Sequence, residues 1–127
     1  MSDLNNRKDI ENLVDSFYRK VLADEIIGFI FTEVVKLDWV KHIPRMYDFW
    51  ETTLFHKTTY KGNPLAVHIE INKKIKLEKK HFDRWLMLFN QAVDSLFIGK
   101  NAEQVKVRAL SIATIIQIKI QKSIEKN

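Results

Sequence analysis

A histidine follows the only stretch in which glycine and proline come close together, YKGNPLAVH at residues 60–68. An imidazole is a common metal ligand and can exchange a proton near neutral pH. Pro64 fixes φ at the start of a predicted short helix, and Gly62 permits a sharp turn before it. Because this stiffened start would hold the side chain that follows, His68 is a candidate ligand. We expect its second nitrogen to donate to the carbonyl of Pro64 or Leu65, which would fix its tautomer.

Other side chains with polar tips fall on helix faces that otherwise carry apolar residues: Tyr18, His42, Trp50 and Trp85. A buried hydroxyl, imidazole or indole N–H that finds no partner costs about 1–3 kcal/mol. One such residue is ordinary, because it can bond a backbone carbonyl. Several of them on separate helices, facing one interior, indicate a cavity that holds something.

The sequence excludes several kinds of occupant for that cavity. There are 0 cysteines, so disulfides and thiolate metal sites are ruled out. No HExxH, GxGxxG or P-loop motif is present, and no carboxylate pair stands on an apolar face. The inward set is aromatic and aliphatic with one imidazole on a short helix. That environment suits a flat apolar macrocycle whose iron takes the imidazole as an axial ligand, and haem is the obvious candidate.

The elements that must position these residues are predicted to be six helices and no strand. Apolar residues recur at i, i+3, i+4 and i+7 along most of the chain. The predicted helices cover residues 10–22, 26–35, 38–54, about two turns after Pro64, 82–97 and 101–120. Asp24, Asn63 and Asn101 are the expected N-caps, Gly99 ends the fifth helix, and Pro44 is expected within the first turn of the third. The basic stretch at 72–81 is interpreted as a solvated connector.

Length and charge set the wider limits. The chain has 127 residues, which predicts one domain over 1–127, and its formal net charge is +5. No apolar run approaches the roughly 20 residues that span a bilayer, and the N-terminus is polar. We therefore expect a cytoplasmic protein without membrane contact. The basic charge leaves a second hypothesis open, a cofactor-free helical domain that binds nucleic acid or a protein partner. A third is a structural bundle whose polar tips all meet backbone carbonyls.

The sequence resembles a truncated globin, most closely the third group of that family. The segments that carry the resemblance occur in family order across nearly the whole chain: FY at 17–18, GFIF at 28–31, WVKH at 39–42, FW at 49–50, YKGNPLAVH at 60–68 and RWLMLF at 84–89. Each segment alone is weakly specific, and together they are specific. The chain lacks the glycine pair that the first two groups carry after the second helix, which agrees with the third group.

The resemblance implies an abbreviated globin fold, a two-over-two helical sandwich around haem b. It implies His68 as the proximal ligand, Tyr18 and Trp85 as the polar residues over the iron, and His42 at the position of a distal, gate-like residue. For His42, a solvated position at the helix start and direct binding to iron are the alternatives. Further predicted haem contacts are Phe31, Phe49, Leu54, Leu65, Ile75, Phe82 and Phe89.

The implied function is the binding of O₂, NO or CO. Two hydrogen bonds of up to ~3 kcal/mol each, to a ligand that gains negative charge, would slow O₂ release by orders of magnitude. We therefore expect oxygen binding or NO and redox chemistry rather than bulk transport. NO dioxygenase or peroxidase-like turnover would need an external reductase, because no flavin or nicotinamide motif is present.

The remaining polar side chains are predicted to have plainer roles. Lysines between Lys73 and Lys80 could neutralise haem propionates or dock an acidic reductase, although a solvated face is the expected role for most of them. His56 and His81 are expected on the surface. Tyr60 is expected to pack its loop and Trp50 to lie in the core.

Overall fold

The computed structural model describes residues 1–35, 38–58, 60 and 62–125, without the side chains of 64–66 and 123–125. Its elements are five α-helices and one short π-helix: α1 (Arg7–Ala23), η1 (Ile30–Val34), α2 (Trp39–Phe55), α3 (Pro64–Lys74), α4 (Lys79–Leu96) and α5 (Lys100–Glu125). No strand occurs in these ranges, so the predicted all-α class is confirmed. Over the same ranges, no helix combines the length and apolar character needed to cross a membrane.

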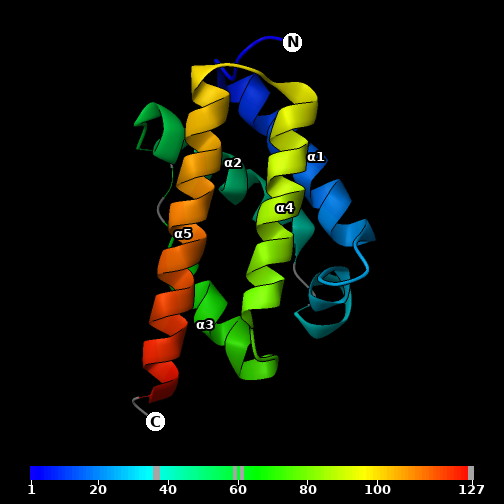
Figure 1. The fold of residues 1–127 in the computed structure, drawn as a ribbon, viewed down its shortest axis with the longest axis vertical. Helices are drawn as coiled ribbons and strands as arrows, with labels where there is room; N and C mark the ends of the chain where they lie inside the picture. Colours follow the sequence, from blue (N-terminus) through cyan, green and yellow to red (C-terminus); the bar gives the residue numbers. More distant parts are fainter. Residues whose placement is uncertain (36–37, 59, 61, 126–127) are drawn as a thin grey trace.

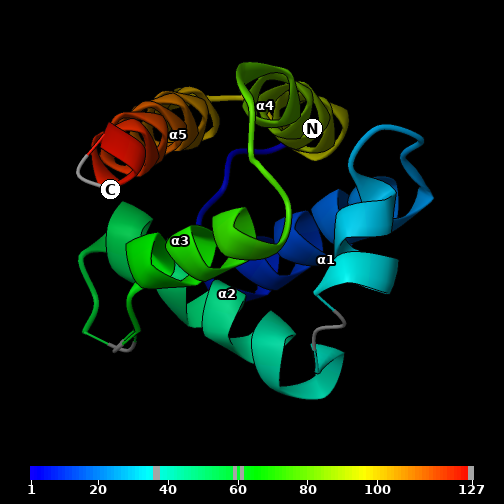
Figure 2. The same ribbon diagram turned by 90° about the horizontal axis from the view of Figure 1, so that it is seen from below.

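The helices form two layers. In Figure 1, α4 and α5 run side by side in front of α1 and α2, and Figure 2 shows α1, α2 and α3 together beneath that pair. α1 packs against both α2 and α4, which joins the layers at one side. At the other side α5 packs against α3 and α2. The predicted sandwich of two helical layers is therefore confirmed.

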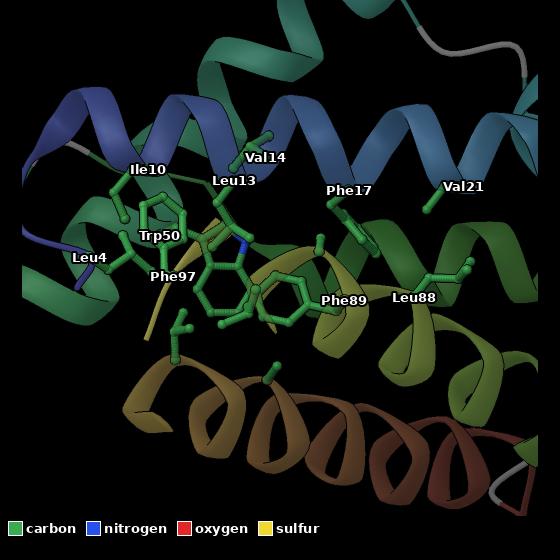
Figure 3. Close-up of a cluster of buried hydrophobic side chains, with 14 of the residues drawn as sticks. Leu4, Ile10, Leu13, Val14, Phe17, Val21, Trp50, Leu88, Phe89 and Phe97 are labelled. Carbon is green, nitrogen blue, oxygen red and sulfur yellow. The ribbon is translucent and has the colours of Figure 1, made fainter. Parts of the chain in front are cut away.

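Aromatic rings fill the centre of the core between α1, α2 and α4 (Figure 3). The rings of Trp50 and Phe89 stack with centroids 4.9 Å apart, and those of Trp85 and Phe89 with centroids 5.6 Å apart. Phe17 meets Phe89 edge-on at 5.3 Å. Such stacked and edge-to-face pairs contribute roughly 0.5–1.5 kcal/mol beyond the area they bury. The predicted core position of Trp50 is confirmed, since its side chain is 4% exposed.

The predicted helix at 26–35 is wrong in type. The chain makes a turn after Asp24 and then the short π-helix η1. Asp24 does cap this turn, because its carboxylate accepts the backbone N–H groups of Ile26 and Ile27, both at 3.0 Å. A β-branched run has low helix propensity, so tertiary packing decides its conformation. Gly28 makes that packing possible, since a Cβ there would lie 3.0 Å from the carbonyl oxygens of both Val21 and Leu22.

The start of α5 also differs from the prediction. Its cap is Asp3, whose carboxylate accepts the N–H groups of Asn101 at 3.0 Å and Ala102 at 2.9 Å. Asn101 lies inside the first turn, and its side-chain amide donates to the Leu4 carbonyl at 2.7 Å. Gly99 has a φ of 143°, and a Cβ there would lie 2.5 Å from the Asp3 side chain. Because this cap comes from residue 3, the residues around the start of α5 do not predict it.

The length of α3 and the position of Pro44 in α2 differ from the predictions. α3 runs to Lys74, about three turns rather than two, so the connector before α4 is shorter than the basic stretch. Pro44 is the sixth residue of α2, beyond the first turn. A proline there removes the hydrogen bond to the carbonyl of Val40. Val40 is 85% exposed, so water can reach this part of the helix.

Candidate functional site

A cavity lies between the helical layers, and every helix contributes to its wall. The wall is mainly aromatic and aliphatic, and the cavity volume is about 180 Å³. Most of the predicted site residues lie in this wall: Tyr18, Phe31, His42, Phe49, His68, Phe82 and Trp85.

Four predicted haem contacts lie elsewhere or are not described. Leu54 and Phe89 are in the hydrophobic core, 6% and 0% exposed, and not in the cavity wall. Helical spacing places them on an inward face but cannot separate core from cavity on that face. Ile75 is half-buried against the core beyond the end of α3. The side chain of Leu65 lies outside the described residues.

Tyr18 and His42 meet at one side of the cavity. The Tyr18 hydroxyl and Nε2 of His42 are 3.0 Å apart, and Trp39 contacts both rings edge-on. Burial raises the pKa of Tyr18, so the phenol keeps its proton and can donate. Burial lowers the pKa of His42, and the positive charges of Arg45 and His68 lower it further. A neutral, half-buried His42 bonded to Tyr18 is not the solvated histidine that the sequence left open.

His68 enters the cavity from α3. It is half-buried, and Ile71, one turn further along the helix, also lines the cavity. His68 and His42 both line this cavity. The predicted hydrogen bond from His68 to the carbonyl of Pro64 or Leu65 stays a prediction.

His81 is the residue whose prediction was most clearly wrong. It is 8% exposed, the one buried polar side chain among the residues that the structure describes, and it lines the cavity. Its Nδ1 accepts the backbone N–H of Glu78 at 2.9 Å in a capping box, which draws the ring inward at the start of α4. Burial lowers the pKa of His81, as does the charge of Lys80, so the ring is neutral with its proton on Nε2. Neither nitrogen then has a free lone pair for a metal.

Three imidazoles line the cavity, those of His42, His68 and His81. Within the described part of the chain, no group of three or more His, Cys, Asp or Glu side chains could hold a metal ion. His42 is bonded to Tyr18, and His81 is committed to its capping box. A metal in this cavity would have to come inside a larger group that supplies its other ligands. His68, on the short helix α3, is the cavity imidazole that the sequence predicted as the ligand of such a group.

Trp85 is held in place from two directions. Its ring stacks on Phe89 with an interplanar angle of 13° and meets Phe17 edge-on at 5.5 Å. The neighbouring Arg84 binds Asp24, with Nη2 and Nε at 2.7 Å and 2.8 Å from Oδ1. Burial alone would raise the pKa of the Asp24 carboxyl, but the hydrogen bonds from Arg84 and the following turn lower it overall. Asp24 thus ties the turn before η1 to the helix that carries Trp85.

Arg45 is the cation in the cavity wall. It stands one turn after His42 on α2 and is exposed at the cavity edge. Of the residues between 73 and 80, all of them described, Leu77 is the one in the wall. The lysines of that stretch are exposed, and Lys73, Lys79 and Lys80 pair with local carboxylates. Arg45 is therefore a further candidate partner for a haem propionate, and the role of the lysines in this stretch stays a prediction.

The other predicted positions can be stated briefly. His56 is exposed and ends α2 with a φ of 58°, as expected for a surface residue. Tyr60 packs its ring against Phe49 at 5.2 Å and is not in the cavity wall. Trp50 lies in the core and also reaches the wall. Wall residues that sequence reasoning did not single out as site residues include Ile27, Met46 and Ile116.

Comparison with known proteins agrees with this architecture. The model of the bacterial-like globin family matches residues 3–118. A group 3 truncated haemoglobin, ctb, of Campylobacter jejuni is 27% identical over 115 residues, which is 88% of each chain. The crystal structure of a group III truncated haemoglobin from Campylobacter jejuni superposes with a TM-score of 0.81 at 27% identity, covering 94% of this chain and 95% of that one. The resemblance seen in the sequence is confirmed, and this chain belongs to the bacterial-like globin family.

Proposed function

We propose that this protein binds haem in the cavity between its helical layers, with His68 as the axial ligand and a diatomic ligand on the side of Tyr18 and Trp85. The single observation that carries the proposal is the arrangement of the wall. The imidazole of His68, a side chain that can bind a metal, lines the same apolar cavity as the phenol of Tyr18 and the indole of Trp85. Family membership supports the same cofactor.

The wall fits haem in its chemistry. Phe31, Phe49 and Phe82 supply flat apolar surface, and Arg45 at the edge can pair with a carboxylate of the cofactor. The three remaining imidazoles do not compete for the metal: His42 is bonded to Tyr18, His81 is bonded to Glu78, and His56 is exposed. Haem b, which has no covalent link to the protein, suits a chain with 0 cysteines.

Haem would supply the iron that binds O₂, NO or CO. The protein's part is to hold His68 on one side and to present hydrogen-bond donors on the other. Because burial keeps the Tyr18 phenol protonated, its hydroxyl can turn from His42 to a ligand that gains negative charge. The indole of Trp85, held by Phe89 and Phe17, supplies the second donor. Hydrogen bonds to charged groups contribute about 1.5–3 kcal/mol each, which favours retention of O₂ over rapid release.

Slow release makes oxygen binding or NO and redox chemistry the proposed role, rather than bulk transport. Turnover as an NO dioxygenase or a peroxidase would require electrons from a separate reductase in the cytoplasm. The sequence alternative of a cofactor-free bundle that binds nucleic acid does not explain a cavity of about 180 Å³. The exposed lysines near α3 and α4 that pair with neighbouring carboxylates do not require a polyanion partner either.

Titration of the purified haem-free protein with haem tests the proposal. We expect a Soret band that saturates at one haem per chain. A titration that stays linear beyond this ratio, with the spectrum of free haem, would contradict a specific site. Saturable binding to an unrelated DNA duplex without any haem spectrum would instead favour the nucleic-acid hypothesis.

A further inference from the structure

The outer face of α5 carries an apolar stripe that no other element covers among the described residues. Val107, Leu110, Ile115 and Ile118 are 62%, 55%, 54% and 49% exposed. They lie on the side of the helix opposite to its buried residues, such as Ala109. Figure 2 shows α5 at the edge of its layer, beside α4. These apolar side chains flank the exposed Ser111 and Thr114 at the middle of the same face, and exposed apolar patches of this kind mark interaction surfaces.

The stripe is symmetric about its own centre, between Ile112 and Ala113. Counted outward from that point, Leu110 and Ile115 are equally distant, and so are Val107 and Ile118. Two copies of α5 placed antiparallel about a two-fold axis would bring each residue of such a pair into one layer with its counterpart on the other copy. A two-fold interface requires this self-complementarity, because both copies present the same patch.

The charges at the ends of the stripe follow the same symmetry. Glu103 and Lys122 are also equally distant from the centre, on the same face, and both are exposed. In the antiparallel arrangement each Glu103 meets a Lys122 of the other copy, so opposite charges pair at both ends. Lys106 reaches Glu103 at 3.1 Å within one chain, yet the Glu103 side chain stays 73% exposed and can take a second partner.

We propose that the protein forms a two-fold dimer in which α5 packs antiparallel against α5 of a second copy. The layers 110–115 and 107–118 form its apolar centre, and the Glu103–Lys122 pairs fix the register. A contact of about three helical turns is small, so the dimer dissociates on dilution. A membrane surface is the less suitable occupant, because the exposed Glu103 at one end of the stripe would face anionic headgroups.

Charge reversal with rescue tests the register. Sedimentation velocity of the purified protein over an about hundredfold concentration range should show a monomer–dimer equilibrium. Glu103→Lys and Lys122→Glu each place like charges at both ends, and each should weaken dimerisation about tenfold. The double variant Glu103→Lys/Lys122→Glu restores both pairs and should recover the original equilibrium. Failure of the double variant to recover, with unchanged haem binding, would overturn this register.

Two further variants test the stripe itself. Leu110→Glu should leave only monomer, whereas Val40→Glu, which places the same charge on an exposed valine of α2, should not change the equilibrium. The native chain has 0 cysteines, so single-cysteine variants report proximity cleanly. Ser111→Cys, beside the proposed axis, should form a disulfide-linked dimer under mild oxidation, and the exposed Ser95→Cys on α4 should not.

The opposite results exclude the proposal. A protein that stays monomeric at the highest concentration, or a dimer that Leu110→Glu leaves intact, would show that α5 is not the interface. Leu110-dependent binding to phosphatidylglycerol vesicles by a monomeric protein would assign the stripe to a membrane surface. None of these outcomes depends on whether the cavity binds haem, because Soret absorbance is recorded separately for each variant.

Discussion

The hydroxyl of Tyr18 lies 3.0 Å from Nε2 of His42, so the residue best placed to stabilise a charged ligand already has a hydrogen-bond partner in this structure. Trp39 contacts both rings edge-on and holds the pair together at the side of the cavity. In the proposed function, a Tyr18 hydroxyl that turned to a ligand would release His42 from this hydrogen bond. This exchange would couple the position of His42 to ligand binding, which is a physical basis for the gate-like role implied by the resemblance.

Removal of the Tyr18 hydroxyl should speed O₂ dissociation. We expect Tyr18→Phe to raise the O₂ off-rate about 10- to 100-fold, the equivalent of one hydrogen bond to a charged group. CO dissociation should change little because CO gains less charge. Stopped-flow replacement of O₂ by CO measures both rates. Tyr47→Phe is the matched control, since Tyr47 donates to Asp15 and is not in the cavity wall.

Trp85→Phe should act in the same direction through loss of the indole N–H, while a flat ring keeps the contacts with Phe89 and Phe17. The same replacement experiment measures its O₂ and CO rates. Unchanged O₂ kinetics in both Tyr18→Phe and Trp85→Phe would show that the donors over the ligand have been assigned wrongly.

His42→Leu separates two roles for that histidine. If His42 holds the Tyr18 hydroxyl away from the ligand, O₂ binding must first break the Tyr18–His42 hydrogen bond, which costs about 1 kcal/mol. Removal of His42 abolishes this cost, so O₂ affinity should rise about fivefold. If the imidazole itself donates to the ligand, O₂ affinity should fall instead. Equilibrium O₂ binding of the two proteins decides between these outcomes.

The folded protein should lose stability as the pH falls below about 6.5, the ordinary histidine pKa. Burial lowers the pKa of both His42 and His81, so the unfolded chain binds more protons than the folded chain in this range. By linkage, the free energy of unfolding then rises with pH and falls on acidification. Asp3 and Asp24, whose pKa values are also lowered in the fold, extend the loss to more acidic pH.

Urea unfolding of the haem-free protein at pH 7.5 and pH 5.5 measures this dependence. The double variant His42→Gln/His81→Gln should show a smaller difference between the two conditions. An equal difference in the variant would mean that these histidines do not carry the effect.

Arg45 should contribute to haem retention more than the lysines near α3. We expect Arg45→Leu to speed the transfer of haem to an acceptor apoprotein several-fold, because the cation in the cavity wall is lost. Lys74→Leu removes an equal charge from an exposed position at the end of α3 and should leave the rate unchanged. Equal effects of the two substitutions would indicate a general influence of net charge.

Helix periodicity and polar tips on apolar faces are local signals, and they predicted the helical class and several residues of the cavity wall. The two-layer sandwich was implied by the resemblance to truncated globins. Leu54 and Phe89, predicted as haem contacts, lie in the core and not in the cavity wall, because periodicity finds the inward face but not the boundary between core and cavity. Sequence reasoning also misjudged the start of α5, where the cap comes from Asp3 at the far end of the chain.

The burial of His81 was not predicted for a different reason. Its neighbourhood is rich in lysine, which suggested a solvated connector. The capping box with Glu78 is a local motif in which histidine takes the place of the usual Glu or Gln, so the pattern was not recognised. The π-helix η1 likewise depends on Gly28 packing against the end of α1, which becomes evident only in three dimensions.

The most direct test of the account is the spectrum of His68→Gly after haem titration, with and without added imidazole. We predict loss of the wild-type Soret band and of stable haem retention, and recovery of the wild-type spectrum when imidazole enters the space left by the side chain. His56→Gly, at an exposed histidine, should retain the wild-type spectrum throughout. A His68→Gly protein that binds haem with the wild-type spectrum in the absence of imidazole would show that another residue holds the iron.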